Sequence, residues 1–298
     1  MFYLILKRTP NPLARKLARA YNLSAIALHD LWCSLHWYLG GCYFYRRHFD
    51  RLRRQHRWIF IVGCNNSGTT LLQKILEGTG AVSTHRYEGQ MYTRVLARTR
   101  RRGHMRVWSD YLPDLIIAPD HEMTQAPRLL HDWMRALPRP VRPIIVEKTP
   151  ANLMRMGWLA RIFPNSSFIG MARNGYAVAE GIRRKGEQEI GKAASHWNQV
   201  NTIMREQQAT VPNFHLLRYE DLCDHPHKTL TELAPILGID AEVLITAAGK
   251  AFSLLTVEGS GASYLTNYNP ASFARLTKED KKRIHDNAAP MLAWLGYE

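Results

Sequence analysis

The chain has 298 residues, 46% of them hydrophobic, which suits one large or two small globular domains and excludes a low-complexity or repeat protein. Its net charge of +15 favours an anionic partner such as a nucleotide, a sulfated or phosphorylated ligand, nucleic acid or acidic lipid. The four cysteines lack the spacing of a disulfide framework or a zinc site, which favours a reducing compartment.

The first 57 residues form a basic extension that contains an aromatic segment. They hold eleven lysine and arginine residues against two acidic residues, so their net charge is +9. Residues 23–45 are long enough to cross a bilayer, but His29, Asp30 and His36 interrupt them and both flanks are basic. Residues 8–20 are too polar for the core of a signal peptide. We expect one or two amphipathic helices on an anionic membrane surface; packing against the rest of the chain or a partner subunit of a homo-oligomer, and a true span, are the alternatives.

Residues 58–80 predict a strand, a glycine-bounded loop and a helix. WIFIV is an apolar run typical of a buried parallel strand, and TTLLQKILEGTG has helical periodicity and stops at a glycine. The loop between them, GCNNSGTT, has the layout of a phosphate-binding P-loop, with Gly63 and Gly68 at the spacing of G-x-x-x-x-G-K-[ST]. Thr69 occupies the lysine position. A polyphosphate with Mg²⁺ would therefore lack its main charge clamp, whereas a single 5′-phosphate group would still fit the backbone donors.

Three further apolar runs predict strands at 143–148, 166–173 and 213–222. Helical stretches separate them, at 152–163 and 193–207, and residues 93–142 are expected to form a basic helix or loop and then a helix. This alternation predicts an α/β fold, a P-loop-type parallel sheet flanked by helices, over residues 58–298. Each strand ends in polar residues, and ligands of open α/β sheets bind at the carboxyl ends of the strands.

Four segments, in this order, resemble sulfotransferases that use 3′-phosphoadenosine 5′-phosphosulfate (PAPS). NNSGTTLL at 65–72 resembles the 5′-phosphosulfate loop of that family, [PRK]-x-S-G-T-T-x-L, and matches it from Ser67 to Leu72. FPNSSFIGMARNGYAVAEGI at 163–182 resembles the family's 3′-phosphate-binding element. LLRYEDLCDHPHKTLTELAPILGI at 216–239 is similar to its R-Y-E-D-L segment, and AAPMLAWLGYE at 288–298 resembles the end of tyrosylprotein-type enzymes. The motif style is closest to tyrosylprotein-type and bacterial sulfotransferases. The resemblance implies a nucleotide-binding transferase with PAPS as co-substrate and no metal.

The resemblance places the nucleotide on the P-loop and on the segment that follows the third strand. The loop residues it implies are Asn65, Asn66, Ser67, Gly68, Thr69 and Thr70. Arg173 would bind the 3′-phosphate as a two-pronged donor, with the next helix N-terminus adding backbone donors. The family commonly has a serine eight residues after this arginine, where this chain has Gly181. A basic residue one turn on would compensate, from among Arg183, Arg184 and Lys185.

Two more segments are expected near the nucleotide. In the R-Y-E-D-L segment, Tyr219 would pack against it, while Glu220 and Asp221 would brace loops. The glycine- and serine-rich stretch at 259–276 resembles a loop that closes over the nucleotide, in which Ser272 and Arg275 would contact phosphate. A plain surface loop is the alternative there.

The reaction that the resemblance implies needs a base for the acceptor hydroxyl and positive charge on the sulfuryl oxygens. Glu88 in THRYEGQMYTR is the favoured base, because tyrosylprotein-type enzymes carry theirs in a comparable setting. His85 is the competitor, and a plain loop carboxylate paired with Arg86 or Arg94 is the third alternative. Lys148 would stabilise charge on the sulfuryl group or the leaving oxygen. Because position 66 usually carries Arg or Lys, either Lys148 carries more of this load or turnover is slow, down to an inactive enzyme.

The aromatic, basic extension favours an acceptor near a membrane. We therefore expect the hydroxyl of a carbohydrate or lipid, with peptide tyrosine as the alternative. The expected location is cytoplasmic, peripheral at a membrane inner face, with a Golgi-type anchored enzyme as the alternative.

A non-catalytic basic protein that binds lipid or nucleic acid would explain the charge but not the ordered motifs, so no nucleic-acid partner is expected. A P-loop small-molecule kinase would need the missing lysine, with Glu147 to hold Mg²⁺.

Overall fold

The computed structural model describes residues 24, 27–99, 106–118, 120–250, 252–253, 262–263 and 265–297. Its strands are β1 (Arg57–Gly63), β2 (Val82–Thr84), β3 (Ile144–Lys148), β4 (Ser166–Ala172), β5 (Phe214–Arg218), β6 (Phe252–Ser253) and β7 (Ala262–Ser263). Its α-helices are α3 (Cys42–Arg47), α4 (Phe49–Leu52), α5 (Thr69–Gly78), α6 (Leu112–Leu115), α7 (Ala126–Ala136), α8 (Met156–Ile162), α9 (Gly175–Gly186), α10 (Ile190–Gln207), α11 (Tyr219–Asp224), α12 (Pro226–Leu237), α13 (Ala241–Gly249), α14 (Asn269–Phe273) and α15 (Lys278–Trp294). Tighter or wider turns occur at η1 (Trp37–Gly41), η2 (Gly89–Met91), η3 (Trp108–Tyr111), η4 (Met123–Gln125), η5 (Pro150–Arg155) and η6 (Gln208–Thr210).

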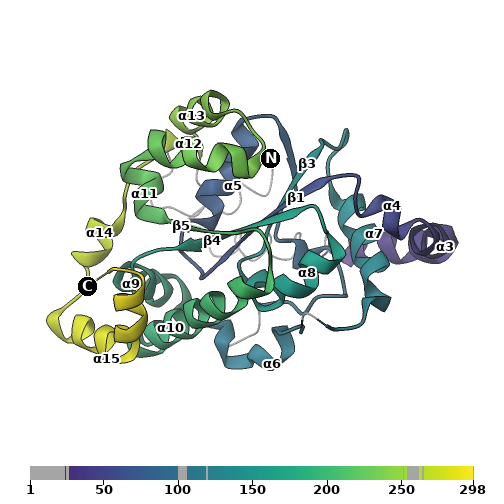
Figure 1. Ribbon diagram of the computed structural model, residues 1–298. Helices are drawn as coiled ribbons and strands as arrows, with labels where there is room; N and C mark the ends of the chain where they lie inside the picture. The colour runs from purple at the N-terminus through teal and green to yellow at the C-terminus, as the bar shows by residue number, and fades with distance from the viewer. Residues whose placement is uncertain are drawn as a thin grey trace.

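The main sheet has five parallel strands in the order β2-β3-β1-β4-β5, with β1 in the middle. β6 and β7 form a separate antiparallel pair. Helices cover both faces of the main sheet, α5 and α11–α13 on one side and α8–α10 and α15 on the other (Figure 1). The prediction of a P-loop-type parallel sheet flanked by helices is confirmed.

Each face of the sheet has its own hydrophobic core, and β1 contributes to both. Trp58 and Phe60 point into the core that also holds side chains of α7, α8, α9, α10 and α15. Ile59 and Ile61 point into the core shared with α5, α12 and α13. All four side chains are fully buried, as the period of two in a strand requires when both faces are covered.

Two strand predictions needed correction. β2 has only three residues and was not predicted, because a strand that short leaves no apolar run in the sequence. The strand expected at 213–222 ends at Arg218, and α11 begins at Tyr219. Glu220 and Asp221 lie in the first turn of that helix, where acidic side chains interact favourably with the helix dipole. Residues 93–99 form bends, and residues 100–105 of the same predicted segment lie outside the described part.

The described part of the extension packs one side against α7. Asp30 pairs with Arg98 at 2.9 Å, and His36 Nδ1 lies 2.9 Å from Nε2 of the buried His131. Among the described residues, no helix is both long and apolar enough to cross a membrane. The extension's residues 1–23, which carry part of the predicted amphipathic region, lie outside the described part.

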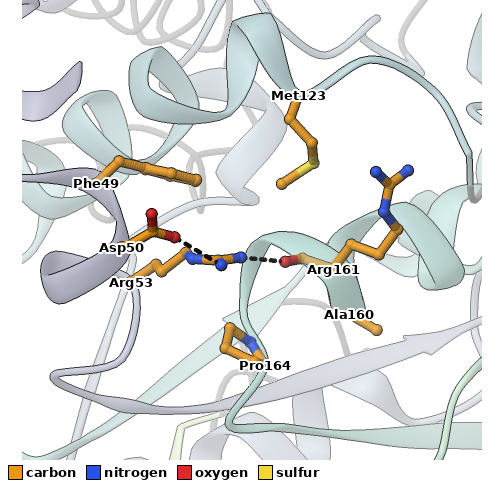
Figure 2. A pocket seen from close by; sticks show the side chains of 7 residues that line it. All are labelled: Phe49, Asp50, Arg53, Met123, Ala160, Arg161 and Pro164. Atoms are coloured by element: carbon orange, nitrogen blue, oxygen red, sulfur yellow. Dashed lines mark hydrogen bonds and ion pairs between the residues drawn. The ribbon is translucent and has the colours of Figure 1, made fainter. Parts of the chain in front are cut away.

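A depression of about 520 Å³ separates α4 from α8 (Figure 2). Arg53 crosses it, paired with Asp50 at 2.7 Å and donating to the carbonyl of Arg161 at 2.6 Å. Pro164 lines the depression just before β4 begins, so it lies at the amino edge of the sheet. The predicted site lies at the opposite, carboxyl edge, and this depression is not part of it.

Candidate active site

The predicted site residues follow one another along the carboxyl edge of the sheet. In strand order, Glu88 follows β2, Lys148 ends β3, the loop follows β1, Arg173 follows β4 and Tyr219 follows β5. The central strand of this row carries the loop, with crossover connections leading away on both sides. This is the position at which open α/β sheets bind their ligands.

Glycines shape the loop between β1 and α5. Gly63 has φ of 139°, and a side chain there would collide with the carbonyl oxygen of Met171 on β4. Gly68 caps α5 with φ of 93°, and a Cβ there would lie 2.7 Å from the ring of Tyr219. Both positions therefore require glycine, because of backbone conformation and of space.

The loop presents donors that have no partner in the described part of the chain. Thr69 and Thr70 are the first residues of α5, and no side chain caps this end of the helix. Ser67 is fully buried, and its Oγ has no hydrogen-bond partner among the described residues. A buried hydroxyl beside an uncapped helix N-terminus is suited to a bound anion, and a phosphate group supplies the acceptors both need.

Arg173 is the second predicted nucleotide residue, and the structure places it against the loop. Its Nη1 donates to the carbonyl of Asn66 at 3.0 Å, and its guanidinium lies over the ring of Tyr219, 4.2 Å from the centroid. Burial lowers the pKa of Arg173. The Tyr219 hydroxyl donates to the carbonyl of Thr266 at 2.9 Å, which ties this stack to the C-terminal segment.

Asn269 is a site residue that the sequence reasoning missed. Its Oδ1 accepts from Arg173 Nε at 2.8 Å, and its Nδ2 donates to Glu220 Oε1 at 2.6 Å. The same oxygen of Glu220 accepts from the backbone of Asn174 at 2.9 Å, so Glu220 braces two loops, as expected. Ser272 lies on the same short helix, α14, and is buried. Of the predicted closing loop, residues 259–261 and 264 lie outside the described part.

Three basic side chains near Gly181 have different surroundings. Arg183 pairs with Asp280 at 2.7 Å and Arg184 with Glu180 at 2.8 Å, so neither replaces the missing serine. Lys185 lies one turn beyond Gly181 on the same helix face; burial and the charges of Arg106, Arg184 and Arg173 lower its pKa to about 8.

Arg275 forms an ion pair with Glu180: its Nε lies 2.8 Å from the buried carboxylate. Its contact with phosphate stays a prediction.

Glu88 and Lys148 meet between β2 and β3. Lys148 Nζ lies 3.4 Å from Glu88 Oε1, and Gln90 Nε2 donates to Glu88 Oε2 at 2.6 Å. The carboxylate is 30% exposed and the lysine 12%. Arg94 pairs instead with Asp30, at 3.9 Å. A carboxylate and a cation held side by side at the edge of the site can accept a proton and stabilise negative charge.

Glu147 positions this pair from below. It is fully buried, and its carboxylate accepts from the Gly89 backbone at 2.7 Å, from Thr149 Oγ1 at 2.5 Å and from Asn152 Nδ2 at 2.5 Å. Burial raises its pKa. With these oxygens occupied inside the protein, Glu147 is not placed to hold the Mg²⁺ of a kinase. Across the described residues, no cluster of three or more His, Cys, Asp or Glu side chains could hold a metal ion.

His85 lies beneath the surface rather than in the site. It is 1% exposed, and its Nε2 donates to the carbonyl of Trp133 at 3.0 Å. Burial lowers its pKa to about 4. These contacts anchor the turn before Glu88 to α7.

Comparison with known proteins gives one consistent result. A model described as the sulfotransferase family matches residues 58–243. The chain is 26% identical to protein-tyrosine sulfotransferase A of Caenorhabditis elegans over 84% of this chain and 69% of that protein, and 27% identical to protein-tyrosine sulfotransferase 2 of Gallus gallus over 83% and 71%. It superposes on sulfotransferase STF1 of Mycobacterium tuberculosis H37Rv with a TM-score of 0.51 and 13% identity, over 95% of this chain and 90% of that one.

Proposed function

The chain belongs to the sulfotransferase family, and we propose that it transfers the sulfuryl group of PAPS to the hydroxyl of a peptide tyrosine. One observation carries the proposal: the Glu88–Lys148 pair, the phosphate loop and Arg173 lie in a row along one edge of the sheet. This row gives a base, an anion cradle and a guanidinium in the order that such a transfer needs.

The residues at this edge fit the nucleotide. The unpartnered Ser67 Oγ and the first turn of α5 would hold the 5′-phosphosulfate, and Arg173 the 3′-phosphate. Tyr219 and Asn269 fix the guanidinium of Arg173 before any ligand arrives, so little ordering is required on binding. PAPS supplies the sulfuryl group, and 3′,5′-adenosine bisphosphate is the product.

Glu88 is the proposed base. As the acceptor oxygen forms its bond to sulfur and the bond from sulfur to the phosphate oxygen breaks, Glu88 takes the hydroxyl proton. Lys148 stabilises the negative charge that develops on the sulfuryl group or on the leaving phosphate oxygen. We propose Glu88 rather than His85 because Glu88 is partly exposed at the site, while His85 is buried with its Nε2 bound to Trp133.

Two observations favour tyrosine over a sugar as acceptor. The relatives that match over more than four fifths of this chain are named as protein-tyrosine sulfotransferases. In addition, Arg86 is exposed two residues before Glu88, and the chain carries a net charge of +15, which suits a peptide with acidic residues around its tyrosine.

The test is transfer from ³⁵S-labelled PAPS to three acceptors: an acidic peptide with one tyrosine, the same peptide with phenylalanine, and a galactose-bearing glycolipid. We expect label in the first peptide alone. Label in the glycolipid alone would move the acceptor to the carbohydrate or lipid class. If none of the three acceptors is labelled although the protein binds the nucleotide product, the protein binds the nucleotide but lacks the proposed transfer activity.

A second proposal concerns where the protein works: we propose that the extension docks on an anionic membrane. Among the described residues, eight of the twelve exposed large hydrophobic side chains lie in the extension: Leu28, Leu31, Trp32, Leu35, Tyr38, Leu39, Tyr43 and Phe44. Arg46 and Arg47 follow on α3, exposed, and with Tyr38 and Tyr43 they line a groove of about 630 Å³. The apolar side chains suit the acyl-chain region of a membrane, and the flanking arginines suit its anionic headgroups.

Co-sedimentation with vesicles tests this docking. The wild-type chain should pellet with vesicles of phosphatidylserine and phosphatidylcholine but much less with phosphatidylcholine alone. Replacing Tyr38 and Leu39 with serine should reduce pelleting several-fold, whereas Val243→Ser, which removes an exposed apolar side chain from α13, should not. A concentration-dependent dimer that those two substitutions abolish, without vesicle binding, would assign the surface to a second copy of the chain instead.

A further inference from the structure

The uncharged residue at position 66 is held by an arginine from a distant segment. Arg106 Nη1 donates to Asn66 Oδ1 at 3.2 Å, and Asn65 Nδ2 donates to the carbonyl of Arg106 at 2.6 Å. Trp108 Nε1 donates to Asn65 Oδ1 at 3.3 Å. Arg106 has φ of 69°, a left-handed conformation that few non-glycine residues adopt. The two loop asparagines therefore fix the segment 106–108 against the phosphate loop.

The other end of the Asn66 side chain faces α9. A Cβ at Gly181 would lie 3.3 Å from Asn66 Nδ2, so this amide lies next to where a serine at 181 would project. Asn66 Nδ2 is buried and has no hydrogen-bond partner among the described residues. The carbonyl of Asn66 accepts from Arg173. Asn66 thus binds one guanidinium through its side-chain oxygen and another through its backbone carbonyl, and an anionic oxygen beside them would satisfy its unpaired amide donor.

Arg106, Arg173 and Lys185 bring three positive charges close to one another. The charges of Arg106 and Arg173 act on Lys185, and with burial they hold its pKa near 8. Glu180, an acid whose charge also reaches Lys185, is itself bound by Arg184 and Arg275. A doubly charged phosphate would interact favourably with these cations.

We propose that Arg106, positioned by Asn65 and Asn66, is an additional ligand of the nucleotide's 3′-phosphate, and that Asn66 Nδ2 donates in place of the absent serine hydroxyl. The inference rests on the proposed function and assigns a residue to the same site. It gives a reason for the departure from the family pattern at position 181: the small residue there leaves room for the amide of Asn66.

Calorimetric titration of the full chain with two probes, 3′,5′-adenosine bisphosphate and 5′-AMP, tests the proposal. Arg106→Gln should weaken bisphosphate binding about tenfold or more, since a hydrogen bond to a charged group is lost, and leave 5′-AMP binding unchanged. Asn66→Ala should do the same, and the double variant should lose little more than either single one. Arg183→Gln is the matched control: it removes a cation from α9 whose partner is Asp280, and should bind as wild type. Thermal melts identify variants that fail to fold. If Arg106→Gln is one of them, Arg106→Lys is the milder substitution, and it should show an intermediate loss of bisphosphate affinity.

The outcomes separate this inference from the function on which it rests. If wild type binds the bisphosphate and Arg106→Gln and Asn66→Ala bind it equally well, the role of Arg106 is refuted while the function stands. An equal loss for both probes would place Arg106 on the 5′ group and overturn the 3′ assignment. If wild type binds neither probe, the proposed function fails and the inference fails with it.

Discussion

Glu88→Gln removes the proposed base while changing little else. The side-chain oxygen of the new glutamine can still accept from Lys148 Nζ, which lies 3.4 Å from Glu88 Oε1. The hydrogen bond from Gln90 is lost, because the NH₂ group of the new glutamine would face the NH₂ group of Gln90. A partly exposed ion pair contributes at most about 1 kcal/mol, so the fold should survive. Removing a general base costs about 10²–10⁴ in rate, equivalent to about 3–5 kcal/mol in the barrier.

The assay is turnover of ³⁵S-labelled PAPS with the tyrosine peptide, together with the dissociation constant of the bisphosphate product. We expect kcat to fall by at least about a hundredfold while nucleotide affinity stays the same. Glu77→Gln is a matched control, since Glu77 also pairs with a lysine, Lys74, and is 28% exposed, but it lies on α5. Retention of kcat within about threefold in Glu88→Gln would refute the assignment. So would an equal loss in a folded His85→Gln variant.

Three further results are expected. Glu147→Gln should lower the free energy of unfolding in urea by about 1–3 kcal/mol, because its amide nitrogen replaces an oxygen that accepts from buried donors; an unchanged midpoint would contradict this. Burial lowers the pKa of His85 to about 4 and of His196 to about 3, so below pH 6.5 the unfolded chain binds more protons than the folded chain. The free energy of unfolding should therefore fall, by about 2 kcal/mol for each residue at pH 5. Urea titrations at pH 7 and pH 5 measure this fall, and equal stability at both would contradict it. Asn269→Ala should weaken binding of the bisphosphate several-fold by freeing the guanidinium of Arg173, and calorimetry showing wild-type affinity would remove Asn269 from the site.

The sequence predicted those parts of the site that depend on local chemistry. A glycine-bounded loop after an apolar run requires its own backbone conformation, so Gly63 and Gly68 indicated the loop between β1 and α5 without further context. Arg173 and Lys148 were predictable in the same way, because each follows or ends a buried strand and parallel strands share one carboxyl edge.

Residues that reach the site through long-range packing were not predictable from sequence. Asn269 lies 96 residues from Arg173, on a helix whose place depends on the C-terminal segment. Arg106 lies 40 residues from Asn66, after a segment without a clear period. Asn65, predicted as a nucleotide contact, turns its side chain to the backbone of Arg106, which no loop motif indicates. The Glu88–Lys148 pair likewise depends on the three-residue β2, which left no pattern.

Ligand-induced stabilisation tests the central claim most directly, with 3′,5′-adenosine bisphosphate compared with ATP–Mg²⁺ on wild type and Arg173→Ala. At about 100 times its dissociation constant, a ligand that binds only the folded state adds about 2.7 kcal/mol of stability. We predict that the bisphosphate stabilises wild type by this amount, that ATP–Mg²⁺ does not, and that Arg173→Ala abolishes the effect. Stabilisation by ATP–Mg²⁺ alone, or by the bisphosphate to the same extent in Arg173→Ala, would contradict the sulfotransferase site described above.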